Sequence, residues 1–207
     1  AAGGFLHVDA VQGPGKIPCD INGLEADLAT ISAHKIGGPA GVGALVGRTD
    51  ELFPEPLIRG GGQERSQRAG TENLIGIAGF GGAAMAARKL FEAERARMAR
   101  LRERLETGLK EATPQVRIFG ADAQRLPNTT LFALGGKAET LVIGFDLEGI
   151  AVASGSACSS GKVTASHVLE AMGVRAELAR GAIRVSLGRL TTEDEVDCCI
   201  AAWKKLA

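Results

Sequence analysis

The sequence predicts an α/β fold, and three observations support this prediction. Short apolar runs separated by glycine-rich turns open the chain, a long charged amphipathic segment follows, and strand-like and helix-like segments then interleave to the end. Apolar runs of this kind are typical of buried strands, and the interleaved pattern favours an α/β or α+β domain. We therefore expect two parts, one over residues 1–90 and the other over residues 91–207, without a flexible linker.

Three strands are predicted in the first part of the chain. Each is a run of mostly apolar residues, and Gly13-Pro14-Gly15 marks a turn between the first two. The runs extend from Gly4 to Asp9, from Asp27 to Ala33 and from Gly41 to Val46.

Two helices are predicted next. Small residues continue from about Asn73 to Ala87, and Gly81-Gly82 predicts a break or a close packing contact. A charged helix from about Leu90 to Ala112 follows. Its buried stripe is predicted from apolar residues at near-heptad spacing, which are Phe91, Met98, Leu101, Leu105 and Leu109.

After Pro114 the predicted elements are shorter. Thr192 with Glu195 three residues later is a favourable start for the last helix, which continues to Leu206. The strands are predicted over residues 116–119, 129–134, 150–153 and 183–187, and the other helices over residues 139–147 and 167–172.

Composition excludes several function classes. The net charge of the 207 residues is +0, which does not favour nucleic-acid binding. No uninterrupted apolar run approaches the roughly 20 residues that span a bilayer, and no signal peptide is visible. The four cysteines form no C-x-x-C pair, so we expect no metal site, no disulfide framework and a cytoplasmic location.

Lys35 is the first candidate for chemistry. It follows the apolar run from Ala26 to Ala33 and precedes a glycine-rich turn. It is either a solvated surface lysine or a partly desolvated amine suited to Schiff-base chemistry. Ser32 and His34 are short donors suited to a phosphate, and Asp9 closes the neighbouring strand, with Gln12 three residues later. A lysine and an aspartate at adjacent strand ends are the protein half of a pyridoxal phosphate site.

Cys158 is the second candidate. It lies in the loop S-G-S-A-C-S-S-G, residues 154–161, which contains no side chain able to fill a core. Unpaired cysteines are usually buried small hydrophobic residues, a description that suits Cys198 and Cys199 well and Cys19 adequately. It suits Cys158 poorly, so we expect Cys158 to be reactive.

Arg184 is the third candidate. In a strand, Ile183, Val185 and Leu187 share one face and Arg184 the other. The arginine is either a surface residue or the anchor of a substrate carboxylate. The polar loop over residues 59–73, with three arginines and no apolar periodicity, is either a solvated loop or a functional one.

Together these segments resemble the C-terminal part of the cysteine desulfurases, enzymes of the class V aminotransferase group that use pyridoxal 5'-phosphate. The resemblance covers essentially the whole chain. It is carried by H-V-D-A-V-Q (7–12), S-A-H-K (32–35), R-G-G-G-Q-E-R and R-A-G-T-E-N (within 59–73), S-G-S-A-C-S-S-G (154–161) and R-V-S-L-G-R (184–189).

The resemblance implies a fold of type I for pyridoxal-phosphate enzymes, with part of a large, mainly parallel domain followed by the small domain. It implies that Lys35 binds the cofactor covalently and that Cys158 takes the sulfur of L-cysteine as a persulfide, leaving L-alanine. Arg184 would hold the substrate carboxylate. The implied cofactor contacts are Asp9 to the ring nitrogen, Gln12 to the ring hydroxyl, and Ser32, His34 and, from a neighbouring subunit, Thr71 to the phosphate.

The resemblance also implies a homodimer and a sulfur-acceptor protein such as an iron–sulfur scaffold. The net charge and the short apolar runs lead us to expect neither nucleic acid nor membrane as a partner. Family members are roughly twice as long, and their first half supplies a phosphate loop and a histidine stacked on the ring. We therefore expect this chain to belong to a longer polypeptide or to pair with a separate chain. Two alternatives remain: another enzyme of the same fold, such as a selenocysteine lyase or an aminotransferase, and a non-catalytic fragment.

Overall fold

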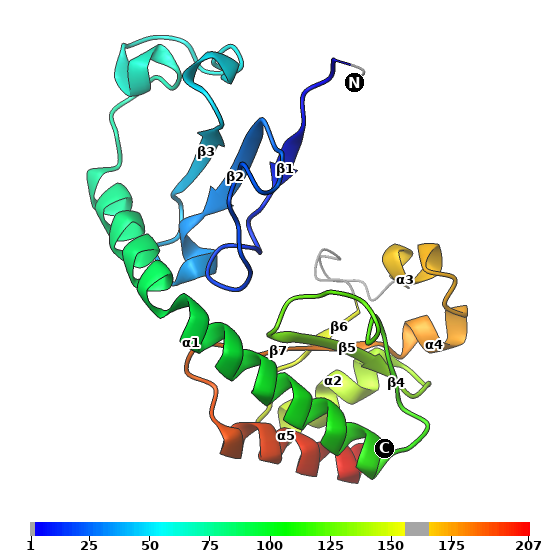
Figure 1. Cartoon of the computed structure of the whole chain (residues 1–207). Coiled ribbons are helices and arrows are strands. Elements are labelled where there is room, and N and C mark those ends of the chain that lie inside the picture. The colour runs from blue at the N-terminus through cyan, green and yellow to red at the C-terminus, as the bar shows by residue number, and fades with distance from the viewer. Residues whose placement is uncertain (1–2, 156–165) are drawn as a thin grey trace. The chain divides into compact units, whose positions relative to one another are not determined.

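The computed structural model describes residues 3–155 and 166–207. The chain divides into two compact units (Figure 1), an N-terminal unit over Ala1–Arg95 and a C-terminal unit over Ala96–Ala207. The division falls inside one long helix, α1 (Leu74–Ala112), to which both units contribute. The expected boundary near residue 90 lies in the same helix.

The N-terminal unit contains a three-stranded sheet in the order β1-β2-β3. Its strands are β1 (His7–Asp9), β2 (Leu28–Ser32) and β3 (Gly43–Gly47). β1 runs parallel to β2, with Asp9 opposite Thr30, and β3 runs antiparallel to β2. All three strands were predicted, although β1 begins only at His7. Three short 3-10 segments were not predicted: η1 (Ala33–Ile36), η2 (Asp50–Leu52) and η3 (Gln63–Ser66).

Helix α1 is continuous over 39 residues, so the predicted break at Gly81-Gly82 is wrong. A glycine inside a helix keeps every backbone hydrogen bond and costs only about 1 kcal/mol relative to alanine, which packing elsewhere can offset. The close approach lies two residues earlier, at Gly79, where an added Cβ would be 3.0 Å from the Pro39 ring. At Gly81 and Gly82 an added Cβ would meet nothing within 4 Å.

Of the described helices, only α1 is long and apolar enough to cross a membrane by length and composition. The sequence had predicted no such segment, because the apolar stretch is broken by charged residues and is not a single run. Its first turns carry exposed apolar side chains, including Leu74, Ile75 and Met85. Length and composition alone do not distinguish a membrane helix from a helix whose apolar face packs against protein.

The C-terminal unit has an antiparallel sheet in the order β4-β5-β7-β6. Its strands are β4 (Arg117–Ile118), β5 (Thr129–Ala133), β6 (Ala153–Ser154) and β7 (Ile183–Ser186). Its helices beyond α1 are α2 (Ala138–Leu147), α3 (His167–Ala171), α4 (Ala176–Arg180) and α5 (Glu193–Leu206). The predicted strand over 150–153 is reduced to its last residue and Ser154, and α4 was not predicted.

One face of this sheet packs against α1, α2 and α5 around Trp203. The indole lies 5.2 Å edge-on from the ring of Phe132 and 6.4 Å from the parallel ring of Phe145, measured between centroids. From α1 the predicted stripe is confirmed in four positions, all buried: Met98, Leu101, Leu105 and Leu109. The fifth predicted position, Phe91, is half-buried in the N-terminal unit.

The other face of the sheet packs against a smaller cluster that includes residues of α3 and α4, among them Leu169 and Ala179. The last helix starts as predicted, because Thr192 and Glu195 exchange side-chain and backbone hydrogen bonds in a capping box. Cys199 is buried as predicted, but Cys198 is exposed. Adjacent helical positions point about 100° apart, so both could not face the core.

Candidate functional site

The candidate site begins where β1 and β2 end. The two strands are parallel and in register, so their carboxyl ends reach the same edge of the sheet. The backbone N–H of Ala10, next to Asp9, donates to the carbonyl of Thr30 at 3.0 Å and extends the pairing. Asp9 therefore lies next to the end of β2, and the chain continues from there through Ser32 to Lys35.

Asp9 is exposed, and its Oδ1 accepts a hydrogen bond from the backbone N–H of Val11 at 3.2 Å. This contact turns the chain immediately after the strand. No described residue donates to its Oδ2. The carboxylate thus keeps acceptor capacity for a ligand.

Lys35 lies in η1, the 3-10 turn that follows β2 without a break. The turn is closed by Gly37, whose φ of 88° lies in the left-handed region that glycine adopts without strain. The Lys35 side chain is exposed, and its amine makes no hydrogen bond or ion pair with the described residues. Its amine is available to a ligand in this structure.

Ser32 directly precedes this turn, and His34 lies inside it next to Lys35. The Ser32 hydroxyl and the His34 Nδ1 are 2.8 Å apart, so the two side chains form one hydrogen-bonding pair. The hydroxyl makes no capping bond to the turn. Both groups can therefore reorient toward an anion such as a phosphate.

Gln12 and Thr71 are the remaining predicted cofactor residues of the N-terminal unit, and both are exposed. Gln12 lies in the turn that follows Asp9. Thr71 ends a loop in which Arg68 donates to the carbonyls of Gly70 and Thr71, at 2.7 and 3.2 Å. No contact joins the Thr71 side chain to Lys35 among the described residues. The roles of Gln12 and Thr71 stay predictions.

Arg184 lies in the C-terminal unit, in the middle of β7. Ile183, Val185 and Leu187 are buried as predicted, whereas Arg184 points to the opposite face and is half-buried between Leu131 and Ala153 on the flanking strands. Its Nε is buried and has no hydrogen-bond partner among the described residues. A buried guanidinium nitrogen without a partner costs free energy, which a bound carboxylate would recover.

Cys158 lies outside the described residues, as does most of its loop. The first two residues of the loop are described. Ser154 ends β6, and the N–H of Gly155 donates to the carbonyl of Ala182 at 2.8 Å. The sulfur-acceptor role of Cys158 stays a prediction.

One residue near Lys35 was missed by the sequence analysis. The Nζ of Lys16, in the turn after Asp9, donates a hydrogen bond to the backbone carbonyl of Lys35 at 3.2 Å. Burial, and to a lesser degree the nearby charge of Lys35, lowers the pKa of Lys16. The only available signal was the position of Lys16 directly after Gly13-Pro14-Gly15, which does not reveal its partner.

The residues at this sheet edge fit pyridoxal phosphate. An exposed carboxylate, an amine without a partner and a hydroxyl–imidazole pair lie at the ends of adjacent strands and supply the charges that the ring nitrogen, the aldehyde and the phosphate require. No group of three or more histidine, cysteine or acidic side chains suited to a metal occurs in residues 3–155 and 166–207.

Comparisons with known proteins define the class. The sequence profile of the family "Aminotransferase class-V" matches residues 1–198. The chain belongs to this family. Within it, the chain is 46% identical over 197 residues to a cysteine desulfurase of Cereibacter sphaeroides, covering 95% of this chain and 50% of that protein. A protein of Anaeromyxobacter sp. named cysteine desulfurase IscS is 45% identical over 201 residues, which cover 95% of this chain and 49% of the relative.

Solved structures agree. A NifS-like protein from Rickettsia africae ESF-5 matches with a TM-score of 0.87 and 41% identity, covering 98% of this chain and 53% of the other. The expected fold, that of pyridoxal-phosphate enzymes of this family, is thereby confirmed. The chain spans about half the length of the curated relatives it matches.

Proposed function

We propose that this chain supplies the lysine and the sulfur-accepting cysteine of a pyridoxal-phosphate-dependent cysteine desulfurase. The observation that carries the proposal is the placement of Asp9 and Lys35 at the ends of adjacent parallel strands, with the Ser32–His34 pair beside them. The names of the relatives support the choice of L-cysteine as the substrate.

The residues at the sheet edge divide the work in this proposal. Lys35 would bind the aldehyde of the cofactor and would move a proton at the substrate. The Asp9 carboxylate would pair with the protonated ring nitrogen, Gln12 would donate to the ring hydroxyl, and Ser32 and His34 would bind the phosphate. When bound, pyridoxal phosphate supplies an electron sink next to the carbon that loses a proton.

Arg184 and Cys158 act on the substrate. The guanidinium of Arg184 binds the carboxylate of L-cysteine through two parallel hydrogen bonds. The thiolate of Cys158 attacks the substrate sulfur, so that the carbon–sulfur bond breaks as a sulfur–sulfur bond forms. The carbon that loses sulfur gains a proton, which leaves L-alanine and a persulfide on Cys158.

The remaining assignments concern partners. A homodimer in which Thr71 contacts the phosphate of the neighbouring subunit, and transfer of the sulfur to an iron–sulfur scaffold or another acceptor, belong to the same proposal. The dimer is supported by the resemblance of residues 59–73 to the family, and the sulfur transfer by the name of the Anaeromyxobacter relative. A cytoplasmic location is also part of the proposal and rests on the cysteine pattern of the sequence.

The test is the variant Lys35→Ala in the purified protein, with Lys89→Ala, an exposed lysine of α1, as the control. The parent and the control should show the visible absorbance band of bound pyridoxal phosphate. Borohydride should trap the cofactor on Lys35, and L-cysteine should give alanine. Lys35→Ala should lose the absorbance band, the trapped link and the formation of alanine. A normal trapped link in Lys35→Ala would contradict the assignment, and consumption of L-cysteine without formation of alanine would favour another enzyme of the same fold.

A further inference from the structure

Lys16 lies where the backbone makes two successive turns after Asp9. The carbonyl of Ala10 accepts from the N–H of Gly13 at 2.8 Å, and the carbonyl of Gly13 then accepts from the N–H groups of Lys16 and Ile17, both at 3.0 Å. These bonds fix the backbone of Lys16 relative to the end of β1.

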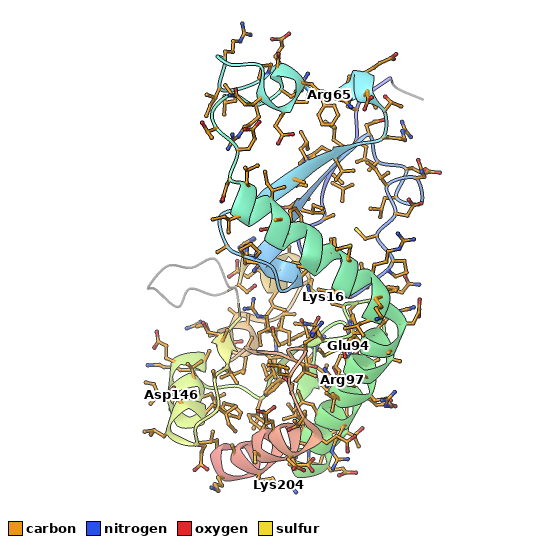
Figure 2. The ribbon with its side chains drawn as sticks, turned by 90° about the vertical axis from the view of Figure 1, so that its left-hand side faces the viewer. Lys16, Arg65, Glu94, Arg97, Asp146 and Lys204 are labelled. Carbon is orange, nitrogen blue, oxygen red and sulfur yellow. The ribbon has the colours of Figure 1, made fainter. Side chains whose placement is uncertain are left out.

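The side chain of Lys16, labelled in Figure 2, extends from this turn to η1. Its Nζ donates to the carbonyl of Lys35 at 3.2 Å. Carbonyls at the end of a helical turn lack partners within the turn, and a nearby lysine can satisfy them. The neighbouring carbonyl of Ala33 has its own partner, the N–H of Gly38 at 2.9 Å, whereas Lys16 is the described donor for Lys35.

Packing keeps Lys16 in reach of this carbonyl. Gly15, with a φ of 75°, turns the chain directly before it, and a Cβ at Gly15 would lie 3.5 Å from the Cβ of Ala87 and 3.8 Å from the Cγ2 of Ile36. The turn therefore sits closely against both η1 and α1 within the N-terminal unit. The backbone of the turn therefore lies close enough to η1 for the Lys16 side chain to reach the carbonyl of Lys35.

The charge of Lys16 is not explained by an ion pair. Among the described residues no carboxylate lies within salt-bridge distance of its ammonium. Burial, with a smaller contribution from Lys35, lowers the pKa of Lys16, so that holding this cation there costs free energy. Lys16 is half-buried, and the carbonyl of Lys35 is its described hydrogen-bond acceptor, so this contact joins it to the turn that carries Lys35.

We propose that Lys16 is a positioning residue for Lys35: its ammonium fixes the backbone of the η1 turn and so holds the Lys35 amine at the sheet edge, beside Asp9. The inference rests on the proposed function of Lys35 as the lysine that binds pyridoxal phosphate. It assigns to the Gly13–Ile17 turn a task that the sequence analysis had not given it, which is to tie the end of β1 to the turn after β2.

Amide hydrogen exchange of the purified protein without added cofactor tests the contact. In Lys16→Met, which keeps the length of the side chain but loses the donor, the amides of Gly37 and Gly38 should exchange about tenfold faster, the effect expected for one lost hydrogen bond. Lys16→Arg keeps a charged donor and should restore slow exchange. Lys35→Ala keeps the backbone carbonyl and should exchange like the parent, as should Lys89→Met on the exposed face of α1.

A second measurement links the contact to the cofactor. The dissociation constant of pyridoxal phosphate should rise about tenfold in Lys16→Met and return toward the parent value in Lys16→Arg. Unchanged exchange at Gly37 and Gly38 in Lys16→Met would overturn the proposal, as would faster exchange that Lys16→Arg does not restore. If the parent protein binds no pyridoxal phosphate, the proposed function fails, whereas the exchange measurement still decides whether Lys16 holds the turn.

Discussion

Arg125 donates two hydrogen bonds to the two carboxylate oxygens of Glu106, at 2.6 and 2.8 Å. The hydroxyl of Thr130 adds a third at 2.7 Å, and the guanidinium of Arg102 lies 3.9 Å away. These contacts tie α1 to β5 and to the segment before it in the C-terminal unit. Burial alone would raise the pKa of Glu106, but the hydrogen bonds and the two arginine charges outweigh it and lower the pKa.

Glu106→Gln should reduce the free energy of unfolding of the C-terminal unit at pH 7 by about 1.5–3 kcal/mol, the range for hydrogen bonds to a charged group. Because the pKa of Glu106 is lowered by folding, its stabilisation is complete above the unfolded value of about 4.3 and is lost as the pH falls through the folded value. The difference between parent and variant should therefore shrink in acid.

Denaturant unfolding between pH 7 and pH 3, followed by circular dichroism, measures this difference. Glu111→Gln, an exposed position on the same helix, is the matched control and should be nearly neutral. A Glu106→Gln difference that is constant with pH would show that the carboxylate charge does not stabilise this unit.

The two glycines Gly79 and Gly82 should respond oppositely to alanine. At Gly82 an added Cβ meets nothing within 4 Å, so the gain in helix propensity should appear as about 0.5–1 kcal/mol of stabilisation. At Gly79 the added Cβ would be 3.0 Å from the ring of Pro39, which cannot rotate away, so Gly79→Ala should lower the free energy of unfolding. Thermal unfolding of both variants tests this. Equal stabilisation would mean that α1 does not pack closely against Pro39.

The cysteines should react with iodoacetamide in a defined order. Burial, together with Cys198, raises the pKa of Cys199 to about 11, so this thiol should be the slowest. Burial and Asp20 also raise the pKa of Cys19. We expect Cys158 to react first and the exposed Cys198 next. Peptide mapping at pH 8 measures the order, and earlier labelling of Cys198 or Cys199 would contradict the role given to Cys158.

Cys158→Ser should separate binding from sulfur transfer. Serine keeps the size of the side chain but is a far weaker nucleophile at neutral pH. The variant should bind pyridoxal phosphate with the parent absorbance spectrum, yet release neither alanine nor sulfide from L-cysteine. Parent-like sulfide release would move the sulfur-acceptor role to another residue.

Arg184→Lys keeps the charge but removes the planar pair of donors. Loss of a charge-assisted contact of about 1.5–3 kcal/mol should raise the KM for L-cysteine tenfold or more, with the cofactor spectrum unchanged. Steady-state kinetics with Arg180→Lys as an exposed control measures the effect. An unaltered KM in Arg184→Lys would place the carboxylate anchor elsewhere.

The spacing of apolar residues predicted which side chains of the long helix and of the arginine strand are buried. Met98, Leu101, Leu105 and Leu109 are buried because their spacing follows the helix repeat, and Arg184 is separated from Ile183 by the alternation of a strand. The continuity of α1 was not predictable, since a glycine pair weakens a helix without deciding whether the flanking turns join. Helix α4 was missed although α3, also of five residues, was predicted. Helix α3 follows Ser166, whose hydroxyl accepts from the N–H of Leu169, whereas Arg175 gives α4 no side-chain cap.

The residues of the candidate site could be predicted from the sequence, but the contact of Lys16 with the Lys35 backbone could not. Asp9, Ser32, His34 and Lys35 follow apolar runs, so their place at strand ends could be inferred. Lys16 could not be found in this way, because its partner is a backbone carbonyl 19 residues away, brought close by the packing of two turns. Every residue has a backbone carbonyl, so a side chain that donates to one has no partner that can be recognised by residue type in the sequence.

The surroundings of Trp203 make the two units separable by spectroscopy. The chain contains one tryptophan and no tyrosine, so its intrinsic fluorescence comes almost wholly from this indole. Because the indole is buried against Phe132 and Phe145, its emission should report the opening of the C-terminal core and stay insensitive to loosening of the sheet that carries Lys35. The visible absorbance of a cofactor bound at Lys35 would report the N-terminal unit. Two optical signals in one sample can therefore follow the two units independently.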